Sequence, residues 1–427
     1  MRWGWPVCLS ILTLCSPCAA QPARDVDWAS CMAAPSRDCI LREAFRLAQS
    51  IKDEPSRGWA LAEIARAQAN LGLREKALEL SLSITVPWRR AEALCYVAEA
   101  QARQGLAKEA AVTFGQAVHT AQSASSNKAE SAEALAVIGE AQTKAGFARE
   151  AVATFKQALR LVQSIKDEPG DFERGRVLVT QVLPGISNSI AASPEFKREA
   201  LVLLKQAEQA APPSGRFDRV DVVAAVARAE AAAGFTQEAT DLARSNHDEY
   251  WRQTVLDNVN KGRNPTEWAA NMLKVLRDWE ERDQIKLTNA LKTPGQFMKK
   301  KSELDRFARD RGSLLREVVV VYSKAGMVKQ ALQVAESPAM LRADDWSRAA
   351  AIEAVARADA KAGMIEEALR LARMISDDWK RASVLVDVVA AQAKAGRTNE
   401  ALGLAQSIAS EFRRVQALRL VAETIPE

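Results

Sequence analysis

A Gly followed five residues later by an Ala occurs seven times, and this recurrence constrains the fold more than any other feature of the chain. Gly72 and Gly105 lie 33 residues apart, as do Gly363 and Gly396. A fixed period of this length is typical of stacked helical repeats, in which each unit contacts only its neighbours. The chain of 427 residues is therefore predicted to form one elongated array. The seven pairs are Gly72/Ala77, Gly105/Ala110, Gly146/Ala151, Gly234/Ala239, Gly326/Ala331, Gly363/Ala368 and Gly396/Ala401.

Each unit reads as two helices joined at its Gly. Apolar residues recur at helical spacing between a repeated Arg and the Gly that stands fifteen residues later, as from Arg57 to Gly72. The Gly is expected to end this first helix in a left-handed conformation, and the following segment opens a second helix. The sequence thus predicts an all-α solenoid of antiparallel helix pairs with about 33 residues per repeat. The repeated arginines are Arg57, Arg90, Arg219, Arg311, Arg348 and Arg381.

The repeats divide the chain into segments. Residues 21–56 are expected to form an N-terminal capping hairpin, because a solenoid end lacks a neighbour to cover it. Residues 57–250 form a repeat array with a degenerate unit near 175–214. Residues 251–312 form a non-repeating basic helical insert, and residues 313–427 form the last repeats with a solitary capping helix.

Residues 1–20 resemble a secretory signal. A short apolar stretch follows Arg2, and Cys18-Ala19-Ala20 provides small residues before the polar Gln21. We therefore expect cleavage after about Ala20 and a periplasmic or secreted protein. No later segment is long and apolar enough to span a membrane.

Three cysteines remain after this cleavage. Cys31 and Cys39 are close enough in sequence to staple the N-terminal hairpin, and an exported protein favours a structural disulfide over a redox pair. Cys95 is the odd thiol. It stands five residues after Arg90, where other units carry residues of differing character, and it is expected to be partly exposed.

Aromatic residues stand two places before an Arg in many units. They are interpreted either as rings packed in the joints between hairpins or as a ladder on which a ligand stacks. The set comprises Trp88, Phe172, Phe217, Tyr250, Trp346, Trp379 and Phe412.

The Gly-to-Ala spacing, the paired helices and the period resemble the tetratricopeptide repeat family over residues 38–427. The resemblance implies a right-handed superhelix whose first helices line a concave peptide-binding groove. Residues nine places after the repeated Arg would face that groove, and they would either contact a polar partner or form a solvated surface. These candidate groove residues are Arg66, Glu99, Glu140, Arg228 and Arg357.

The chain carries no convergent set of catalytic or metal-binding residues. Its two histidines, His119 and His247, lack acidic or cysteine partners at metal-ligand spacing, and no phosphate-binding Gly-rich loop occurs. We therefore expect no catalytic residue, cofactor or metal. A cell-wall hydrolase built on a helical scaffold would need a catalytic domain, and no stretch of the sequence resembles one.

Charge is concentrated locally. The formal net charge of +5 is too small to indicate a nucleic acid partner, but residues 292–316 form a basic segment. The sequence thus favours an exported, non-enzymatic scaffold that binds another protein in the cell envelope. The alternative is an accessory protein that binds an anionic envelope polysaccharide through this segment. Its candidate contact residues are Lys292, Lys299, Lys300, Lys301, Arg306 and Arg309.

Overall fold

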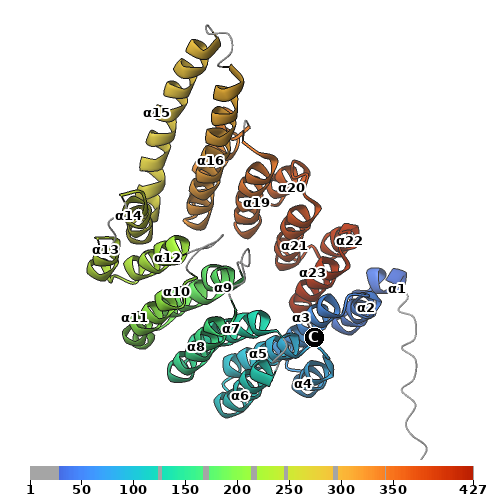
Figure 1. The fold of residues 1–427 in the computed structure, drawn as a ribbon. Coiled ribbons are helices and arrows are strands. Elements are labelled where there is room, and N and C mark those ends of the chain that lie inside the picture. The colour runs from blue at the N-terminus through green and yellow to red at the C-terminus, as the bar shows by residue number, and fades with distance from the viewer. Residues whose placement is uncertain are drawn as a thin grey trace, which may run out of the picture.

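The computed structural model describes residues 28–123, 127–166, 173–212, 219–244, 249–291, 297–341 and 343–426. Every regular element within these ranges is a helix (Figure 1). The predicted all-α class is therefore confirmed. The expected signal over residues 1–20 lies outside the described residues. In the described part of the chain, no helix has both the length and the apolar run needed to cross a membrane.

One helix of each pair faces the centre of the molecule, and these inner helices follow a closed course around it (Figure 1). Consecutive inner helices pack against each other along most of this course. They are α3 (Glu54–Asn70), α5 (Pro87–Arg103), α7 (Lys128–Lys144), α10 (Leu183–Ala192), α12 (Arg219–Ala232), α14 (Glu249–Arg263), α16 (Phe297–Lys324), α19 (Asp345–Lys361), α21 (Asp378–Lys394) and α23 (Glu411–Thr424).

The remaining helices lie mainly on the outside, each packed against an inner helix next to it in the chain. They are α2 (Arg37–Ser50), α4 (Arg74–Ser83), α6 (Ala107–Ser123), α8 (Ala148–Gln163), α11 (Pro194–Gln209), α13 (Thr236–Arg244), α15 (Pro265–Leu291), α17 (Val328–Ala335), α18 (Pro338–Leu341), α20 (Ile365–Arg373) and α22 (Thr398–Ser407).

The seven repeat glycines join inner to outer helices as the sequence predicts. All seven adopt a positive φ between 73° and 87°. This left-handed conformation lets the next amide reach back into the last helical turn, as when Leu73 N donates to Gln68 O at 2.8 Å. A Cβ atom is disfavoured at such a φ, so the repeated Gly is a backbone requirement of the turn.

The repeated Arg has a structural role that the sequence did not reveal. In four units its guanidinium donates to a carbonyl at the end of the preceding outer helix, where the helix dipole favours a cation, and Arg414 makes the same contact at the start of α23. This contact fixes how one hairpin follows the next. The bonds are Arg57 to Ile51 (3.1 Å), Arg90 to Ile84 (2.7 Å), Arg348 to Leu341 (3.1 Å), Arg381 to Ile375 (3.0 Å) and Arg414 to Ile408 (3.1 Å).

The degenerate unit contains an irregular inner helix. The short α9 (Glu173–Val177) and the π-helix η1 (Leu178–Val182) run directly into α10, which carries Pro184. Pro184 has no amide hydrogen, and the π-turn accommodates this by pairing Leu183 N with Leu178 O, five residues back.

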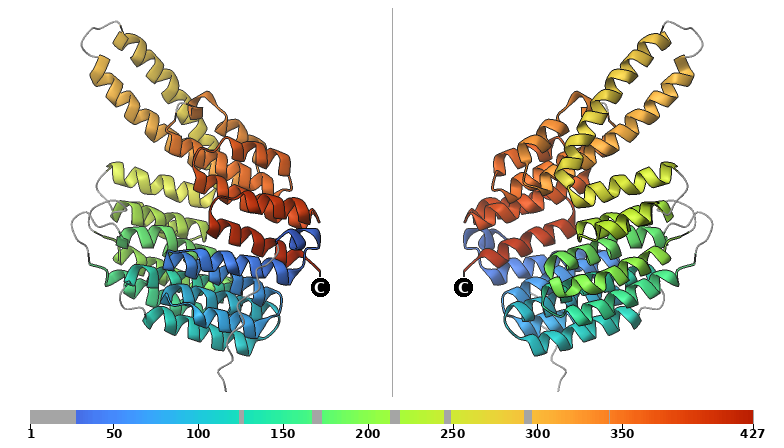
Figure 2. Two further views of the ribbon diagram at one scale, coloured as in Figure 1. Left: turned by 90° about the vertical axis from the view of Figure 1, so that its right-hand side faces the viewer. Right: turned by 90° about the vertical axis from the view of Figure 1, so that its left-hand side faces the viewer.

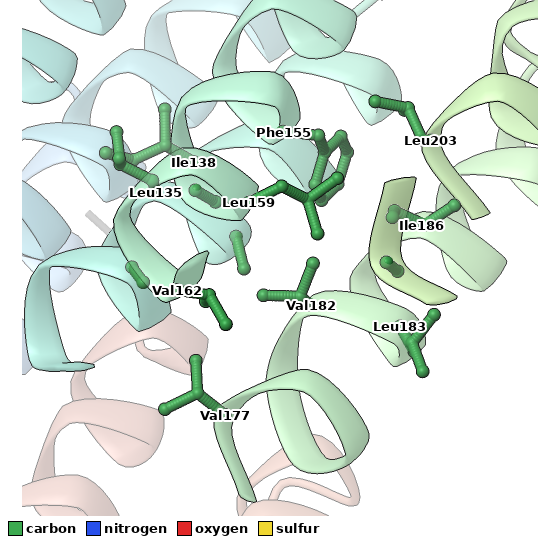
Figure 3. Close-up of a cluster of buried hydrophobic side chains, with 14 of the residues drawn as sticks. Leu135, Ile138, Phe155, Leu159, Val162, Val177, Val182, Leu183, Ile186 and Leu203 are labelled. Atoms are coloured by element: carbon green, nitrogen blue, oxygen red, sulfur yellow. The ribbon is translucent and has the colours of Figure 1, made fainter. Parts of the chain in front are cut away.

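Phe155 of α8 fills the space beside this irregular helix (Figure 3). It is fully buried, and a methyl group built at Gly139 of α7 would lie only 2.9 Å from its Cε2 atom. Gly185 of α10 approaches the same ring. The two glycines therefore admit a large ring between two inner helices.

Helices α15 and α16 are the longest in the structure, with 27 and 28 residues. They pack side by side and extend beyond the other helix pairs (Figure 2). The segment expected to be a non-repeating helical insert thus contributes a projecting helix pair, while the C-terminal half of α16 joins the inner row.

The two ends of the chain meet. Helix α23 packs against α21 on one side and against α3 on the other, while α2 covers α23 as an outer helix (Figure 1). The expectation of separate caps at residues 21–56 and at the C-terminus is therefore corrected. An apolar inner helix at one end and an apolar outer helix at the other cover each other, which closes the array into a ring.

Buried side chains from both ends form one core at this closure. Ile40 and Leu47 of α2 lie in the same cluster as Val415 and Leu418 of α23. The ring of Phe412 stacks on Trp59 with their centroids 4.1 Å apart. The closure is therefore as apolar as the joints between sequence neighbours.

A buried ion pair also crosses the closure. Arg419 Nε of α23 lies 2.8 Å from Glu63 Oε2 of α3, and both side chains are less than a tenth exposed. Arg419 also pairs with Glu423 at 2.8 Å, and Arg37 Nε of α2 donates to Ile425 O at 2.7 Å.

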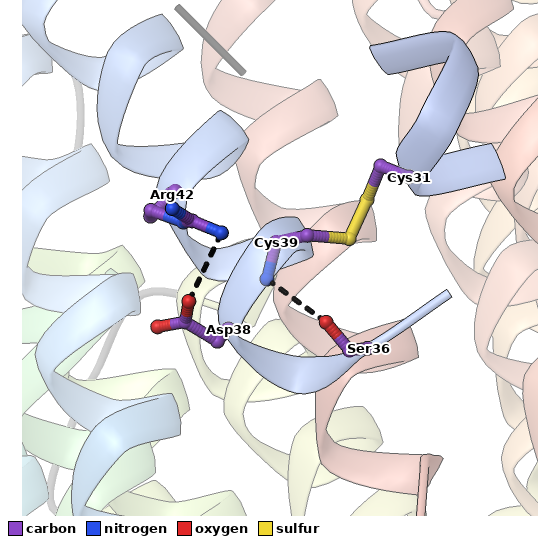
Figure 4. The surroundings of a disulfide bond; sticks show 5 residues. All are labelled: Cys31, Ser36, Asp38, Cys39 and Arg42. Atoms are coloured by element: carbon purple, nitrogen blue, oxygen red, sulfur yellow. Dashed lines mark hydrogen bonds and ion pairs between the residues drawn. A yellow bond between two sulfur atoms is a disulfide. The ribbon is translucent and has the colours of Figure 1, made fainter. Parts of the chain in front are cut away.

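The predicted cysteine pair lies beside the closure. Cys31 of α1 (Trp28–Ala33) and Cys39 of α2 are joined by a disulfide, with their Cα atoms 5.9 Å apart (Figure 4). Ser36 caps α2 by accepting a hydrogen bond from Cys39 N at 3.3 Å. The disulfide thus ties α1 to the helix that covers α23.

We predict that Arg419→Gln destabilises the protein by about 3–5 kcal/mol, because Glu63 would remain buried without its cation. Arg42→Gln is the matched control, since its ion pair with Asp38 is exposed and is worth about 0–1 kcal/mol. Urea unfolding followed by circular dichroism measures both. Equal losses in the two variants would contradict a buried closure pair.

Candidate functional site

A cavity of about 840 Å³ opens on the inside of the ring. Its wall comes from the inner helices of the degenerate unit and of the units that follow it, α10, α12, α14, α16 and α19, with Pro265 at the start of α15. Small residues such as Ala225, Ala229 and Ala354 leave room in this wall. The volume lies in the range of small-molecule and peptide pockets, roughly 300–1,000 Å³.

The cavity wall is strongly basic. Among the residues that the structure describes, two acidic side chains line it, Glu317 and Glu353, against six basic ones. In a recess bounded by protein, charges of one sign reinforce each other and attract anions. The basic residues are Arg228, Lys261, Arg316, Lys324, Arg357 and Lys361.

Two of these basic residues have carboxylate partners. Lys261 pairs with Glu317, and Arg357 Nε lies 2.6 Å from Asp387 Oδ2 of α21. Burial raises the pKa of Glu353, although Arg357 and Lys380 counteract this. The carboxylates of the wall are therefore already engaged by its cations.

The other four basic residues form no ion pair with a carboxylate of the described chain, and they supply the excess charge. Burial lowers the pKa of Arg228 because the guanidinium loses contact with water, and the charge of Glu317 opposes this effect. The pKa of Lys261 is also lowered by burial, against the opposing effect of Glu317. A bound anion would relieve this cost. The four residues are Arg228, Arg316, Lys324 and Lys361.

The structure separates the predicted groove residues into two groups. Arg228 and Arg357 line the cavity together, but Arg66, Glu99 and Glu140 do not. Arg66 stacks over the Tyr96 ring at 4.8 Å, and Glu140 pairs with Lys144 on its own helix. The row of groove residues therefore runs around the ring, and only its second half reaches the cavity.

Sequence reasoning missed Lys324 and Lys361 although a signal was present. A basic residue stands two places before five of the seven repeat glycines, and two of these five line the cavity. This position ends the inner helix, where the dipole also favours a cation. The five are Arg103, Lys144, Lys324, Lys361 and Lys394.

The predicted anionic-partner patch stays a prediction. Lys299, Lys300, Lys301, Arg306 and Arg309 lie on the projecting half of α16, and Lys292 lies outside the described residues. Arg316, at the end of the same basic segment, is part of the cavity wall.

The interpretation of Cys95 as partly exposed was wrong. Its side chain is completely buried, and burial raises its pKa well above the usual value. The equivalent apolar residues Ala62, Ala224 and Val386 are buried too, whereas the charged residues at this position, Arg316 and Glu353, are only partly buried and line the cavity.

The aromatic residues that stand two places before an Arg differ in burial. Phe412 is buried in the closure, as a joint residue should be, but Trp346 and Trp379 are 54% and 50% exposed. Packing between hairpins therefore accounts for only part of this set. Across the described residues, no group of three or more His, Cys, Asp or Glu side chains is placed to hold a metal ion.

Comparison with known proteins assigns no family to the chain. No family model matches it, and no curated protein sequence does. Ton1535 from Thermococcus onnurineus NA1 matches 89% of this chain with 94% of its own, at 16% identity and a TM-score of 0.33. An engineered protein matches 90% with 98% of its own, at 14% identity and a TM-score of 0.29. A circular tandem repeat protein with novel repeat topology matches 91% with 95% of its own, at 15% identity and a TM-score of 0.20.

Two buried acids replace a repeated Gln near the cavity. Four of the seven units carry Gln four places before the repeat Gly, but α12 carries Glu230 and α19 carries Asp359 there. Both are almost completely buried, and within the described part of the chain Glu230 Oε2 and both Asp359 carboxylate oxygens have no hydrogen-bond partner. Burial raises the pKa of Glu230 to about 7 and that of Asp359 to about 6.

We predict that the ring loses stability as the pH rises. The folded state keeps these two carboxyl groups protonated above the pH at which the unfolded chain releases their protons. Stability therefore falls between about pH 4 and about pH 7, and Glu230→Gln should add about 1–3 kcal/mol at about pH 8 but little at about pH 4.

Thermal unfolding of the wild type, Glu230→Gln and Asp359→Asn across this range measures the effect. Glu109→Gln changes an exposed carboxylate and is the control. A gain in the buried variants that does not depend on pH would contradict the assignment of buried, protonating carboxyl groups.

Proposed function

We propose that the protein is a non-catalytic binding scaffold whose ring takes an acidic segment of a partner protein into its basic cavity. The observation that carries this proposal is the set of four cavity cations without carboxylate partners, Arg228, Arg316, Lys324 and Lys361. Carboxylates of a partner would form charge-assisted hydrogen bonds with them and complete the charge balance of the wall.

The distribution of cations over the wall supports an extended segment as the ligand. These cations come from four different inner helices, α12, α14, α16 and α19. A polypeptide with several carboxylates reaches more of these cations at once than a single small anion does.

We infer that the ring is a divergent, closed form of the tetratricopeptide-like solenoid, with a right-handed course and about 33 residues per unit. Support comes from the seven left-handed glycines and from the Arg-to-carbonyl contacts that recur between units.

An extracytoplasmic location is also proposed. The signal-like sequence of residues 1–20 and the Cys31–Cys39 disulfide support export to the cell envelope, because disulfides persist in oxidising compartments. The acidic partner would then be an envelope or secreted protein.

An anionic polysaccharide is the second candidate ligand. Arg316 favours it, because this residue belongs to the basic segment 292–316 and also lines the cavity. A polymer of uronic acids could therefore run from the projecting pair α15–α16 into the ring.

The test is binding of fluorescein-labelled polyglutamate and of a labelled polyuronate oligosaccharide, measured by fluorescence anisotropy at low salt. We expect polyglutamate to bind, with an affinity that falls as ionic strength rises. The triple variant Arg228→Gln, Lys324→Gln, Lys361→Gln should weaken this binding about tenfold or more, since each lost charge contributes about 0.5–1 kcal/mol.

The matched control is the variant Lys76→Gln, Lys108→Gln, Arg149→Gln, which removes the same charge from exposed outer-helix positions. If the control weakens polyglutamate binding as much as the cavity variant does, net charge and not the cavity is responsible. Retention of the polyuronate alone would transfer the function to the second candidate.

A further inference from the structure

Four aromatic rings follow one another at the starts of successive inner helices. Trp346 begins α19, Trp379 begins α21, Phe412 begins α23, and Trp59 lies near the start of α3. Phe412 stacks on Trp59 with centroids 4.1 Å apart and on Trp379 with centroids 6.3 Å apart. We call this row, which crosses the ring closure, the aromatic ladder.

Cations lie over the faces of these rings. The Arg316 guanidinium lies 4.5 Å from the centroid of Trp346, and that of Arg413 lies 4.2 Å from the centroid of Trp379. Such cation–π contacts fix the orientation of the indoles. The ladder is thus a rigid surface, held by side chains of the helices on either side.

One end of the ladder is buried and the other is open. Phe412 is packed in the closure core, but the two Trp side chains remain about half exposed. Two further large apolar side chains are exposed just before them, Leu341 at 56% and Met374 at 47%. Exposed Trp side chains in contact with Arg have the composition of a protein-binding hot spot.

The open end of the ladder adjoins the basic cavity. Trp346 stands four residues before Ala350 on α19, so the two side chains lie on one helix face, and Ala350 lines the cavity. Arg316 belongs to both surfaces, because it lines the cavity and stacks on Trp346. Its Nε atom is buried and has no hydrogen-bond partner among the described residues.

We propose that Trp346 and Trp379 dock apolar or aromatic side chains of the same segment whose carboxylates enter the cavity. This inference rests on the proposed function and specifies the partner as an extended peptide that mixes acidic with aromatic residues. Charge complementarity selects the acidic residues, and the exposed indoles select the aromatic ones. Arg316 is positioned to receive a carboxylate next to the docked ring.

Charges around the ladder disfavour other occupants. The exposed carboxylates of Asp345 and Asp378 flank the two Trp residues, and each is paired with an arginine, Arg348 or Arg381. Arg316 and Arg413 already lie over the indole faces on which a sugar ring would stack.

The test compares two fluorescein-labelled peptides of equal charge, six repeats of Glu-Phe and six repeats of Glu-Ser. The wild type should bind the Glu-Phe peptide about tenfold more tightly, because aromatic docking adds to the same electrostatic attraction. In Trp346→Ala/Trp379→Ala this preference should fall below about twofold, while affinity for the Glu-Ser peptide stays unchanged.

Leu82→Ala/Val112→Ala is the matched control, since both residues are exposed apolar side chains on outer helices. It should retain the full preference. Circular dichroism checks that both double variants are folded, as expected from the exposure of the replaced side chains.

The outcomes separate the two proposals. If both peptides bind the wild type with equal affinity, the docking site is overturned and the cavity proposal stands. The same conclusion follows if the Trp346→Ala/Trp379→Ala variant still binds the Glu-Phe peptide more tightly than the Glu-Ser peptide. If neither peptide binds, both proposals fall. Trp-dependent binding of cellohexaose or of anionic lipid vesicles, without any preference for the Glu-Phe peptide, would also overturn the peptide assignment.

Discussion

The packing of α23 between α21 and α3, with α2 covering it, is the contact on which the rest of the structure depends. Each solenoid unit leaves an apolar face that the next unit must cover. Here the last inner helix and the first outer helix cover each other, so the array needs no terminal cap. The Glu63–Arg419 pair and the Phe412–Trp59 stack make this joint specific as well as apolar.

Closure determines how the inner surface is used. In an open superhelix, like charges on the concave face can separate and remain hydrated. In the ring, inner helices surround the cavity, and Arg228 and Lys261 are buried enough that their pKa values are lowered. The stability of the ring therefore offsets the cost of a basic recess, and a carboxylate ligand would recover part of that cost.

The local architecture could be read from the sequence, but the closure could not. Seven glycines predicted seven left-handed turns because each turn has a steric requirement that only neighbouring residues determine. Whether two distant ends of the chain meet depends on small rotations accumulated over all units, and no single residue encodes them. The Arg37 side chain and the Ile425 backbone carbonyl, which are hydrogen-bonded across the closure, are 388 positions apart.

The same distinction explains the candidate site. Arg228 and Arg357 were found from their repeat position, yet Arg66 and Glu140 share that position and do not line the cavity. Which units approach each other depends on the irregular inner helix with Pro184 and on the long pair α15–α16, both of which break the period. The exposure of Cys95 was predicted wrongly because it was inferred from the residue types at this repeat position and not from how the helices pack there.

The most direct test of the closed ring is chemical crosslinking of Ser50→Cys with Glu411→Cys, in a Cys95→Ala background. These two side chains are 361 residues apart in sequence and are hydrogen-bonded across the closure at 3.4 Å. A short bismaleimide should join them within one chain in high yield, whereas Lys108→Cys with Glu411→Cys should give none, as intact-mass analysis would show. Failure of the first pair to crosslink, or equal yields for both pairs, would contradict the ring.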